Sequence, residues 1–168
     1  MTRWVASWRT GCVRRVLLAV EEAAEHTKLW WGAAVALSAV GWRGRRAATV
    51  GLASMAVAEL ASNCVLKRVW HRRRLPKEWI SHEEVHDRPG SSSFPSGNTA
   101  AGVAFSAAVA AVWPWAGAVC AVPAAAVAAE RVHTGAHYPS DVAVGAAIGL
   151  AAAALVRRAP RLASRLLR

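Results

Sequence analysis

The stretch that decides the fold reads TAAGVAFSAAVAAVWPWAGAVCAVPAAAVAA, from Thr99 to Ala129, and contains no charged residue. Its 31 residues exceed one membrane crossing of about 20 residues and fall short of two long ones. Pro114 lies between Trp113 and Trp115 in the middle of the stretch. Proline removes a helix hydrogen-bond donor, and tryptophan favours the membrane interface. The stretch therefore predicts two short membrane helices joined by a tight turn at Pro114.

The composition indicates a lipid-facing protein of one domain. The chain has 168 residues, of which 55% are hydrophobic, with nine Trp and only two Phe. A chain of this length fits one domain, and so hydrophobic a chain is not intrinsically disordered. Lys and Arg outnumber Asp and Glu by 21 to 10, which gives a net charge of +11. Because the Arg clusters bracket apolar runs, membrane topology explains this charge better than nucleic-acid binding, which would need those runs to form a soluble core.

The cysteines carry no recognisable metal or disulfide pattern. Cys12, Cys64 and Cys120 lie far apart and form neither a CxxC nor a Cys/His spacing. They predict no disulfide framework and no zinc site. The cysteines therefore point to no metal cofactor.

Three further apolar runs complete the expected bundle. The run from Leu29 to Trp42 has tryptophans at both ends, which is typical of an interfacial belt. Its 14 residues are few for a crossing, and this length also fits a buried helix or a re-entrant segment. The run from Ala47 to Leu66 has 20 residues, interrupted only by Glu59. The run from Val142 to Val156 consists mostly of Ala, Val and Gly, which let membrane helices approach closely. The predicted fold is all-α, an integral membrane bundle of about five transmembrane helices.

The ends of the chain are expected to lie outside the bundle. Residues 1–27 mix arginines with apolar residues and then carry three glutamates. This pattern predicts an amphipathic helix lying on the bilayer, because the arginines interrupt the apolar centre that a signal peptide would need. We expect residues 28–158 to form the transmembrane domain and residues 159–168 to form a basic C-terminal tail.

Three polar clusters lie at the ends of the apolar runs. They are Lys67–Pro76 (KRVWHRRRLP), Phe94–Asn98 (FPSGN) and Arg131–Asp141 (RVHTGAHYPSD). Taken singly, the first fits interfacial anchoring, the second a turn with a helix cap, and the third a structural histidine near an interface. In a bundle with the helix order above, however, all three clusters meet on one side of the membrane.

Residues of all three clusters together would bind a phosphate group. Phosphoryl transfer requires charge neutralisation on three equatorial oxygens. Cations and the backbone N–H groups of a helix start supply this neutralisation. The candidate phosphate ligands are Lys67, Arg74, Ser96, Gly97 and Arg131, with Asn98 beside them.

The third cluster supplies an attacking group. His137 is a nucleophile when its imidazole is neutral, and Asp141 four residues later accepts a hydrogen bond from its other nitrogen. Pro139 lies between them. We therefore expect His137 to lie just before the helix that carries Asp141.

These motifs resemble a known family. Lys67-x6-Arg74, Pro95-Ser96-Gly97 and Arg131-x5-His137-x3-Asp141, in this order, are similar to the three signature motifs of the type 2 phosphatidic acid phosphatase (PAP2) superfamily. The resemblance implies an all-helical membrane enzyme that removes phosphate from lipid phosphates without a metal. It implies that His137 becomes phosphorylated, that Asp141 orients it, and that the other motif residues bind phosphate. Substrates in the family are phosphatidic acid, phosphatidylglycerol phosphate, and polyprenyl phosphates or diphosphates.

The chain departs from the family pattern at three positions. Leu75 follows Arg74 where Pro is usual, Glu130 stands where Ser is usual, and Asn98 replaces the His that acts as general acid and base. An amide does not change protonation state at working pH, so the hydrolysis of esters with poor leaving groups should be slowed most. We expect either a preference for diphosphates or a substitute base. The candidates for that base are His71, His82, His86 and His133.

A second function remains open because of Asn98. The same cluster could bind a phospholipid headgroup without turning it over, as a weak or inactive PAP2-like protein would. The expected partners are a lipid phosphate and the bilayer, with no nucleic acid; nothing in the sequence predicts an oligomeric state. On the side without motifs lie eight arginines and no acid, namely Arg43, Arg45, Arg46, Arg157, Arg158, Arg161, Arg165 and Arg168. The positive-inside rule then favours a cytoplasmic C-terminus and an active site facing outward. The compactness of the chain favours a bacterial inner-membrane protein.

Overall fold

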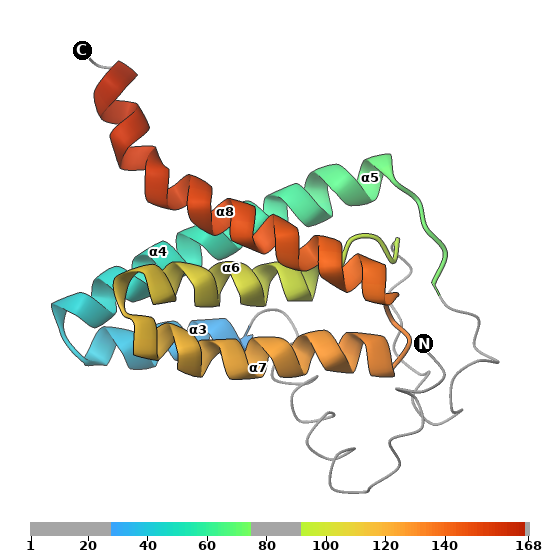
Figure 1. Ribbon diagram of the computed structural model, residues 1–168, viewed down its shortest axis with the longest axis horizontal. Coiled ribbons are helices and arrows are strands. Elements are labelled where there is room, and N and C mark those ends of the chain that lie inside the picture. Colours follow the sequence, from blue (N-terminus) through green and yellow to red (C-terminus); the bar gives the residue numbers. More distant parts are fainter. Residues whose placement is uncertain (1–27, 75–91, 167–168) are drawn as a thin grey trace, which may run out of the picture.

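The computed structural model describes residues 28–74 and 92–166, with side chains as far as Ala159. Within these residues the secondary structure is entirely helical (Figure 1). The helices are α3 (Lys28–Ala39), α4 (Trp42–Glu59), the π-helix η2 (Leu60–Leu66), α5 (Lys67–Val69), α6 (Gly97–Val112), α7 (Pro114–His133) and α8 (Pro139–Leu166). Because α4, η2 and α5 follow without a break, the described part contains five continuous helices. The helix predicted within residues 1–27 lies outside the described residues.

Three of these helices are long and apolar enough to cross a membrane. They are Trp42–Val69, Pro114–His133 and Pro139–Ala159, and the shorter Gly97–Val112 is also apolar. Large apolar side chains face outward on the bundle, among them Trp115, 81% exposed, and Val122, 71% exposed. Such exposure is normal where lipid replaces water. The predicted all-α membrane bundle is confirmed.

The turn predicted at Pro114 is confirmed. Helix α6 ends at Val112 and α7 begins at Pro114, where the missing N–H costs no helix hydrogen bond. Arg43 covers this corner, donating from Nε and Nη2 to the Val112 carbonyl oxygen at 3.2 Å each. Its guanidinium also lies 5.8 Å from the centre of the Trp113 ring. A basic residue therefore satisfies an orphaned carbonyl at the C-terminus of α6.

The apolar run from Leu29 to Trp42 forms a helix, α3, that is shorter than the run. Helix α3 ends at Ala39. Helix α4 begins at Trp42, ahead of the next apolar run, which starts at Ala47. Gly41 joins them with φ of +105°, a conformation that side-chain-bearing residues rarely adopt. Trp30 is not an interfacial anchor: it is 2% exposed and packs on Phe105, with ring centres 5.5 Å apart.

Helix α6 lies between α7 and α8 and forms the centre of the bundle (Figure 1). Small residues permit this packing. A Cβ on Gly117 would lie 2.3 Å from the Ala110 Cα, and one on Gly149 would lie 2.6 Å from the Ala100 carbonyl oxygen. Close approach of backbones replaces the hydrophobic driving force that lipid does not provide.

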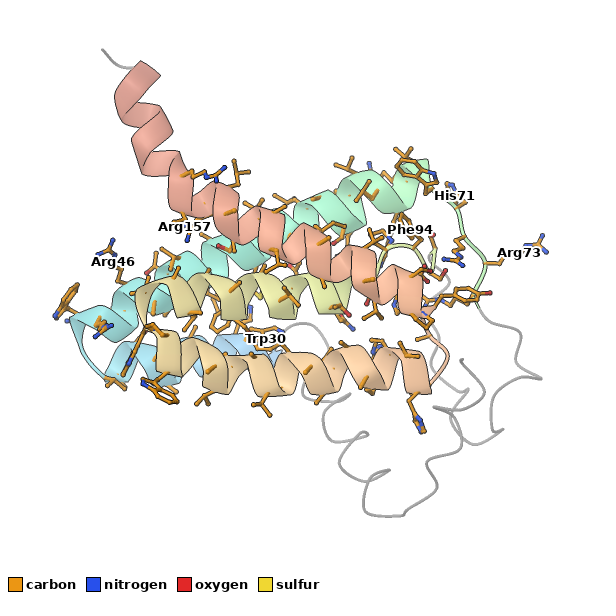
Figure 2. All side chains as sticks on the ribbon, in the orientation of Figure 1. Trp30, Arg46, His71, Arg73, Phe94 and Arg157 are labelled. Atoms are coloured by element: carbon orange, nitrogen blue, oxygen red, sulfur yellow. The ribbon has the colours of Figure 1, made fainter. Side chains whose placement is uncertain are left out.

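The chain order brings four helix ends to one end of the bundle. The ends of α5 and α7 and the starts of α6 and α8 lie together on the right of Figure 1. Arg46 and Arg157 lie at a distance from that end, whereas His71 and Phe94 lie at it (Figure 2). Helix α8 continues to Leu166, so residues 159–166 prolong this helix beyond the bundle. The predicted meeting of the three polar clusters rests on this arrangement.

Candidate active site

The first cluster follows the end of α5 as an extended segment. The Arg72 N–H donates to Ser92 Oγ at 3.0 Å, and the Ser93 N–H donates to the Arg72 carbonyl oxygen at 3.0 Å. The rings of Trp70 and Phe94 pack edge to face, 6.2 Å between centres. These contacts join the segment after α5 to the segment before α6, which carries the second cluster.

The second cluster forms the N-terminus of α6. Ser96 is fully buried, and its Oγ shares a hydrogen bond of 2.9 Å with Thr99 Oγ1. The Ser96 N–H is already used, because it donates to the Asp141 carbonyl oxygen at 3.1 Å. The N–H groups of Gly97, Asn98 and Thr99 are the orphaned donors of the first helical turn, and no described side chain caps them. These amides are therefore the ones available to an anion.

Two close approaches hold this turn in place. A Cβ on Gly97 would lie 2.8 Å from Asn63 Oδ1, so the Asn63 side chain of η2 packs directly on the turn. A Cβ on Gly145 would lie 2.5 Å from the Ser96 carbonyl oxygen, so α8 packs on it from another direction. The π-helical turn that carries Asn63 is of the kind frequent at functional sites.

The third cluster carries the candidate nucleophile. His137 is 5% exposed and precedes α8, as predicted. Its N–H donates to the Arg131 carbonyl oxygen at 2.9 Å, and its Nδ1 lies 2.5 Å from the Ser93 carbonyl oxygen. A carbonyl oxygen only accepts, so Nδ1 carries the proton of the neutral ring and Nε2 carries the lone pair.

The surroundings of His137 keep its imidazole neutral. Burial, and after it the positive charges of Arg74, Lys67 and Arg131, together lower its pKa from 6.5 to about 3, against the hydrogen bond to Ser93, which raises it. The three predicted cations therefore all act on the same ring. A neutral imidazole beside three cations can act as a nucleophile toward an anion.

The cationic cluster, defined as Lys67, Arg74 and Arg131, is held by specific contacts. Arg74 Nη1 donates to the Ala136 carbonyl oxygen at 2.7 Å. Arg131 is 9% exposed, and its Nε hydrogen-bonds the carboxylate of Glu130, which is fully buried. Glu130, which stands where the family usually has Ser, therefore contacts the candidate phosphate ligand Arg131 directly.

Asp141 lies near His137, but its carboxylate accepts hydrogen bonds from other residues. Its Oδ2 is 3.9 Å from His137 Nδ1, beyond a hydrogen bond, and accepts from the Tyr138 N–H at 3.0 Å. Its Oδ1 accepts from Arg72 Nη1 at 2.7 Å. The structure thus brings Asp141 to the site, while the Ser93 carbonyl makes the direct hydrogen bond to the ring.

The remaining predicted residues take different positions. Asn98 lies in the first turn of α6 and is half-buried. Among the proposed substitute bases, His133 is buried in the last turn of α7 and His71 is exposed (Figure 2). His82 and His86 lie outside the described residues.

An apolar groove leads away from the site. It has a volume of about 500 Å³ and is lined by residues of α6, α7 and α8. Thr99 and Val142 lie at its site end, Ala121 lines its α7 wall, and Pro114 lines its far end. From Thr99 to Ala110 along α6 the groove runs for roughly 16 Å at the usual helical rise. It offers room for a hydrocarbon chain beside the anion site.

Sequence reasoning missed two residues of the site, Ser93 and Arg72. Ser93 acts through its backbone carbonyl, which no side-chain pattern reveals. Arg72 is one of three consecutive arginines, and nothing in the sequence distinguishes it from Arg73. Among residues 28–74 and 92–166, no group of three or more His, Cys, Asp and Glu side chains is placed to hold a metal ion.

Comparison with known proteins agrees with the motifs. The sequence profile of the PAP2 superfamily matches residues 47–165. No curated protein matches the chain.

Two crystal structures share the fold. That of Aquifex aeolicus LpxE has a TM-score of 0.75 and 19% identity, covering 94% of this chain and 92% of the other. That of a transmembrane PAP2-type phosphatidylglycerolphosphate phosphatase from Bacillus subtilis has a TM-score of 0.70 and 20% identity, covering 95% of this chain and 82% of the other. The family profile covers more than two thirds of the chain and includes all three motifs, and the protein therefore belongs to the PAP2 superfamily.

Proposed function

We propose that the protein is a membrane phosphatase that hydrolyses a lipid phosphate or diphosphate through a phosphohistidine at His137. The observation that carries the proposal is the buried, neutral His137 ring, whose Nδ1 is fixed by Ser93 while three cations surround it. A ring so held has one nucleophilic atom, Nε2, and the cations favour an anion beside it.

The first step transfers the phosphoryl group. The His137 Nε2 lone pair forms a bond to phosphorus, while the bond from phosphorus to the leaving oxygen breaks. Lys67, Arg74 and Arg131, with the amides of Gly97 and Asn98, stabilise the charge on the equatorial oxygens. The leaving oxygen departs with the electron pair of the broken bond.

The second step returns the histidine to its starting state. Water attacks phosphorus, the P–N bond breaks, and the proton of water passes to solvent or to a base. Inorganic phosphate leaves and His137 is again a neutral imidazole. No metal or cofactor is needed in either step.

Asn98 determines which leaving group we expect. An amide donates a hydrogen bond but gives up no proton, whereas a lipid alkoxide needs protonation to leave. A phosphate leaving group is already a stable anion at neutral pH. The proposal therefore favours diphosphates such as polyprenyl diphosphates over monoesters such as phosphatidic acid or phosphatidylglycerol phosphate.

The apolar groove supports a lipid substrate. Its lining is apolar apart from Thr99 and Ser106, and its site end lies one helical turn from Ser96. A hydrocarbon chain in the groove would place its phosphate at the start of α6. The Bacillus subtilis structure with the same fold is titled a phosphatidylglycerolphosphate phosphatase, which also supports a phosphate carried by a lipid.

The distribution of arginines supports a site that faces away from the cytoplasm, and the two bacterial proteins with the same fold support a bacterial membrane. Arginines without nearby acids cluster toward the end represented by Arg46 and Arg157, away from His71 and Phe94 (Figure 2). Cytoplasmic loops carry an excess of basic residues. The active site then faces away from the cytoplasm.

Phosphate release by the detergent-purified protein tests the proposal. We expect release from a polyprenyl diphosphate and complete loss of release in His137→Ala. Ala121→Phe should block the groove and lower kcat/KM for the lipid, while leaving hydrolysis of a soluble diphosphate unchanged. Val122→Phe is the matched control, because Val122 is its neighbour on α7 but does not line the groove.

Inactivity of the wild type toward every substrate would contradict the proposal. If Asn98→His were then active, the protein would be a lipid-headgroup binder with an intact anion site. Equal effects of Ala121→Phe on lipid and soluble substrates would contradict the role of the groove.

A further inference from the structure

We propose that Arg72, an unspecified position of the Lys67-x6-Arg74 motif, is a positioning residue that fixes the tautomer and charge environment of His137. The proposal rests on His137 being the nucleophile of the proposed phosphatase. Arg72 is the one residue of the described chain that binds both to the backbone holding the His137 ring and to the carboxylate nearest that ring.

The guanidinium of Arg72 binds the start of α8. Its Nη1 donates to Asp141 Oδ1 at 2.7 Å and to Ser140 Oγ at 2.8 Å. Its central carbon lies 3.9 Å from the centre of the Tyr138 ring, a cation–π contact. The Arg72 side chain is 42% exposed, whereas the Asp141 side chain is fully buried. The buried carboxylate is therefore compensated by a cation at the surface of the site.

The backbone of Arg72 binds the segment that orients His137. Its carbonyl oxygen accepts from the Ser93 N–H at 3.0 Å, and its N–H donates to Ser92 Oγ at 3.0 Å. The Ser93 carbonyl in turn accepts from His137 Nδ1. A displacement of Arg72 would thus reach the His137 ring through one intervening residue.

The contact between Arg72 and Asp141 has an electrostatic consequence for the His137 ring. The groups that act on the His137 ring are Lys67 on α5, Arg74 after α5, Arg131 on α7 and Asp141 on α8. The three cations favour the neutral ring, and a free Asp141 carboxylate at 3.9 Å would favour the protonated ring. By binding Oδ1, Arg72 compensates that carboxylate.

The neighbouring Arg73 provides a matched comparison. Its side chain points away from the bundle (Figure 2), and its contact with the site segment is made by its backbone carbonyl, which accepts from Ser93 Oγ at 3.4 Å and is kept in a side-chain substitution. Both positions carry the same side chain on the same extended segment, so only their contacts differ. Loss of charge as such is therefore separable from loss of the side-chain contacts to Asp141 and Ser140.

The test is an NMR titration of ¹⁵N-labelled histidines in the detergent-purified full chain, with the His137 signal identified by its loss in His137→Ala. We expect Arg72→Gln to raise the His137 pKa by about one unit or more, because an uncompensated carboxylate then faces the ring. Arg72→Lys should restore most of the wild-type value, and Arg73→Gln should leave the pKa unchanged. The acid limb of kcat/KM should move upward with the titration in Arg72→Gln.

An Arg72→Gln protein whose His137 titrates like that of Arg73→Gln would overturn the proposal. Should Arg72→Gln fail to fold, Tyr138→Leu decides instead. Removing the ring beneath the guanidinium should raise the His137 pKa in the same direction by less, and an unchanged value there would contradict the proposal. The titration needs no turnover. If the wild type released no phosphate, the proposed function would be contradicted, but the titration would still test the role of Arg72.

Discussion

The Nδ1 atom of His137 lies 2.5 Å from the Ser93 carbonyl oxygen, so a backbone group fixes the tautomer of the candidate nucleophile. A carbonyl does not ionise, and its acceptor character is the same at every pH. The ring is therefore held with its Nε2 lone pair exposed to reaction wherever His137 itself stays neutral.

The activity should persist far into the acid range. His137 must be neutral to attack, and its pKa is lowered to about 3 by burial and by the neighbouring cations. As the pH falls, the rate should decline through protonation of His137 only near that value. A pH profile of kcat/KM, taken with substrates whose phosphates ionise differently, measures this limb. A substrate-independent loss centred near pH 6.5 would contradict the description of the ring.

Restoring a histidine at position 98 should change substrate preference. Asn98→His introduces a general acid, and such a group typically contributes about 10²–10⁴-fold. The gain should be large for phosphatidic acid and small for a polyprenyl diphosphate, whose leaving group needs no proton. Asn98→Gln, which keeps an amide, serves as the control. Equal gains for both substrates would contradict the leaving-group argument.

The buried carboxylate of Glu130 should weaken phosphate binding. It pairs with Arg131 and offsets part of its charge. Glu130→Gln keeps a hydrogen-bond acceptor but removes the negative charge, so inorganic phosphate should inhibit roughly tenfold more strongly. Inhibition constants for phosphate measure this. Glu59→Gln, the same substitution at an acidic residue of α4, is the control and should leave inhibition by phosphate unchanged. Equal inhibition in wild type and Glu130→Gln would contradict a charge effect.

Gly145 should be required for the position of the second cluster. In Gly145→Ala the new Cβ would lie 2.5 Å from the Ser96 carbonyl oxygen, so α8 or the start of α6 must move. We expect destabilisation of about 1–3 kcal/mol and a larger fall in kcat than in affinity for phosphate. Gly32→Ala is the control, because a Cβ there meets nothing within 4 Å. Thermal unfolding and kcat measure both effects, and a Gly145→Ala protein like Gly32→Ala would contradict the packing argument.

Much of the fold could be predicted because strong local signals set it. The uncharged stretch around Pro114 predicted α6, α7 and their turn, and the order of the apolar runs predicted that three clusters meet at one end. Pro139 correctly placed His137 just before α8. These features depend on hydropathy and proline, whose effects are local.

What the sequence did not predict depends on contacts between distant segments. The corner at Gly41 placed charged Arg43 inside α4, where its guanidinium caps α6. Trp30 became a core residue because Gly102 on α6 leaves room for its ring. The partner of His137 is a backbone carbonyl 44 positions away, and a backbone contact of this kind does not depend on residue type.

Trapping of a phosphoenzyme tests the central claim most directly. Wild-type protein would be mixed with a polyprenyl diphosphate labelled in its terminal phosphate, quenched within milliseconds in base and digested for mass analysis. Phosphohistidine is stable in base and labile in acid, so label on the peptide containing His137, absent from His137→Ala, is the predicted result. Phosphate release that proceeds with no label on that peptide, or that persists in His137→Ala, would contradict nucleophilic catalysis by His137.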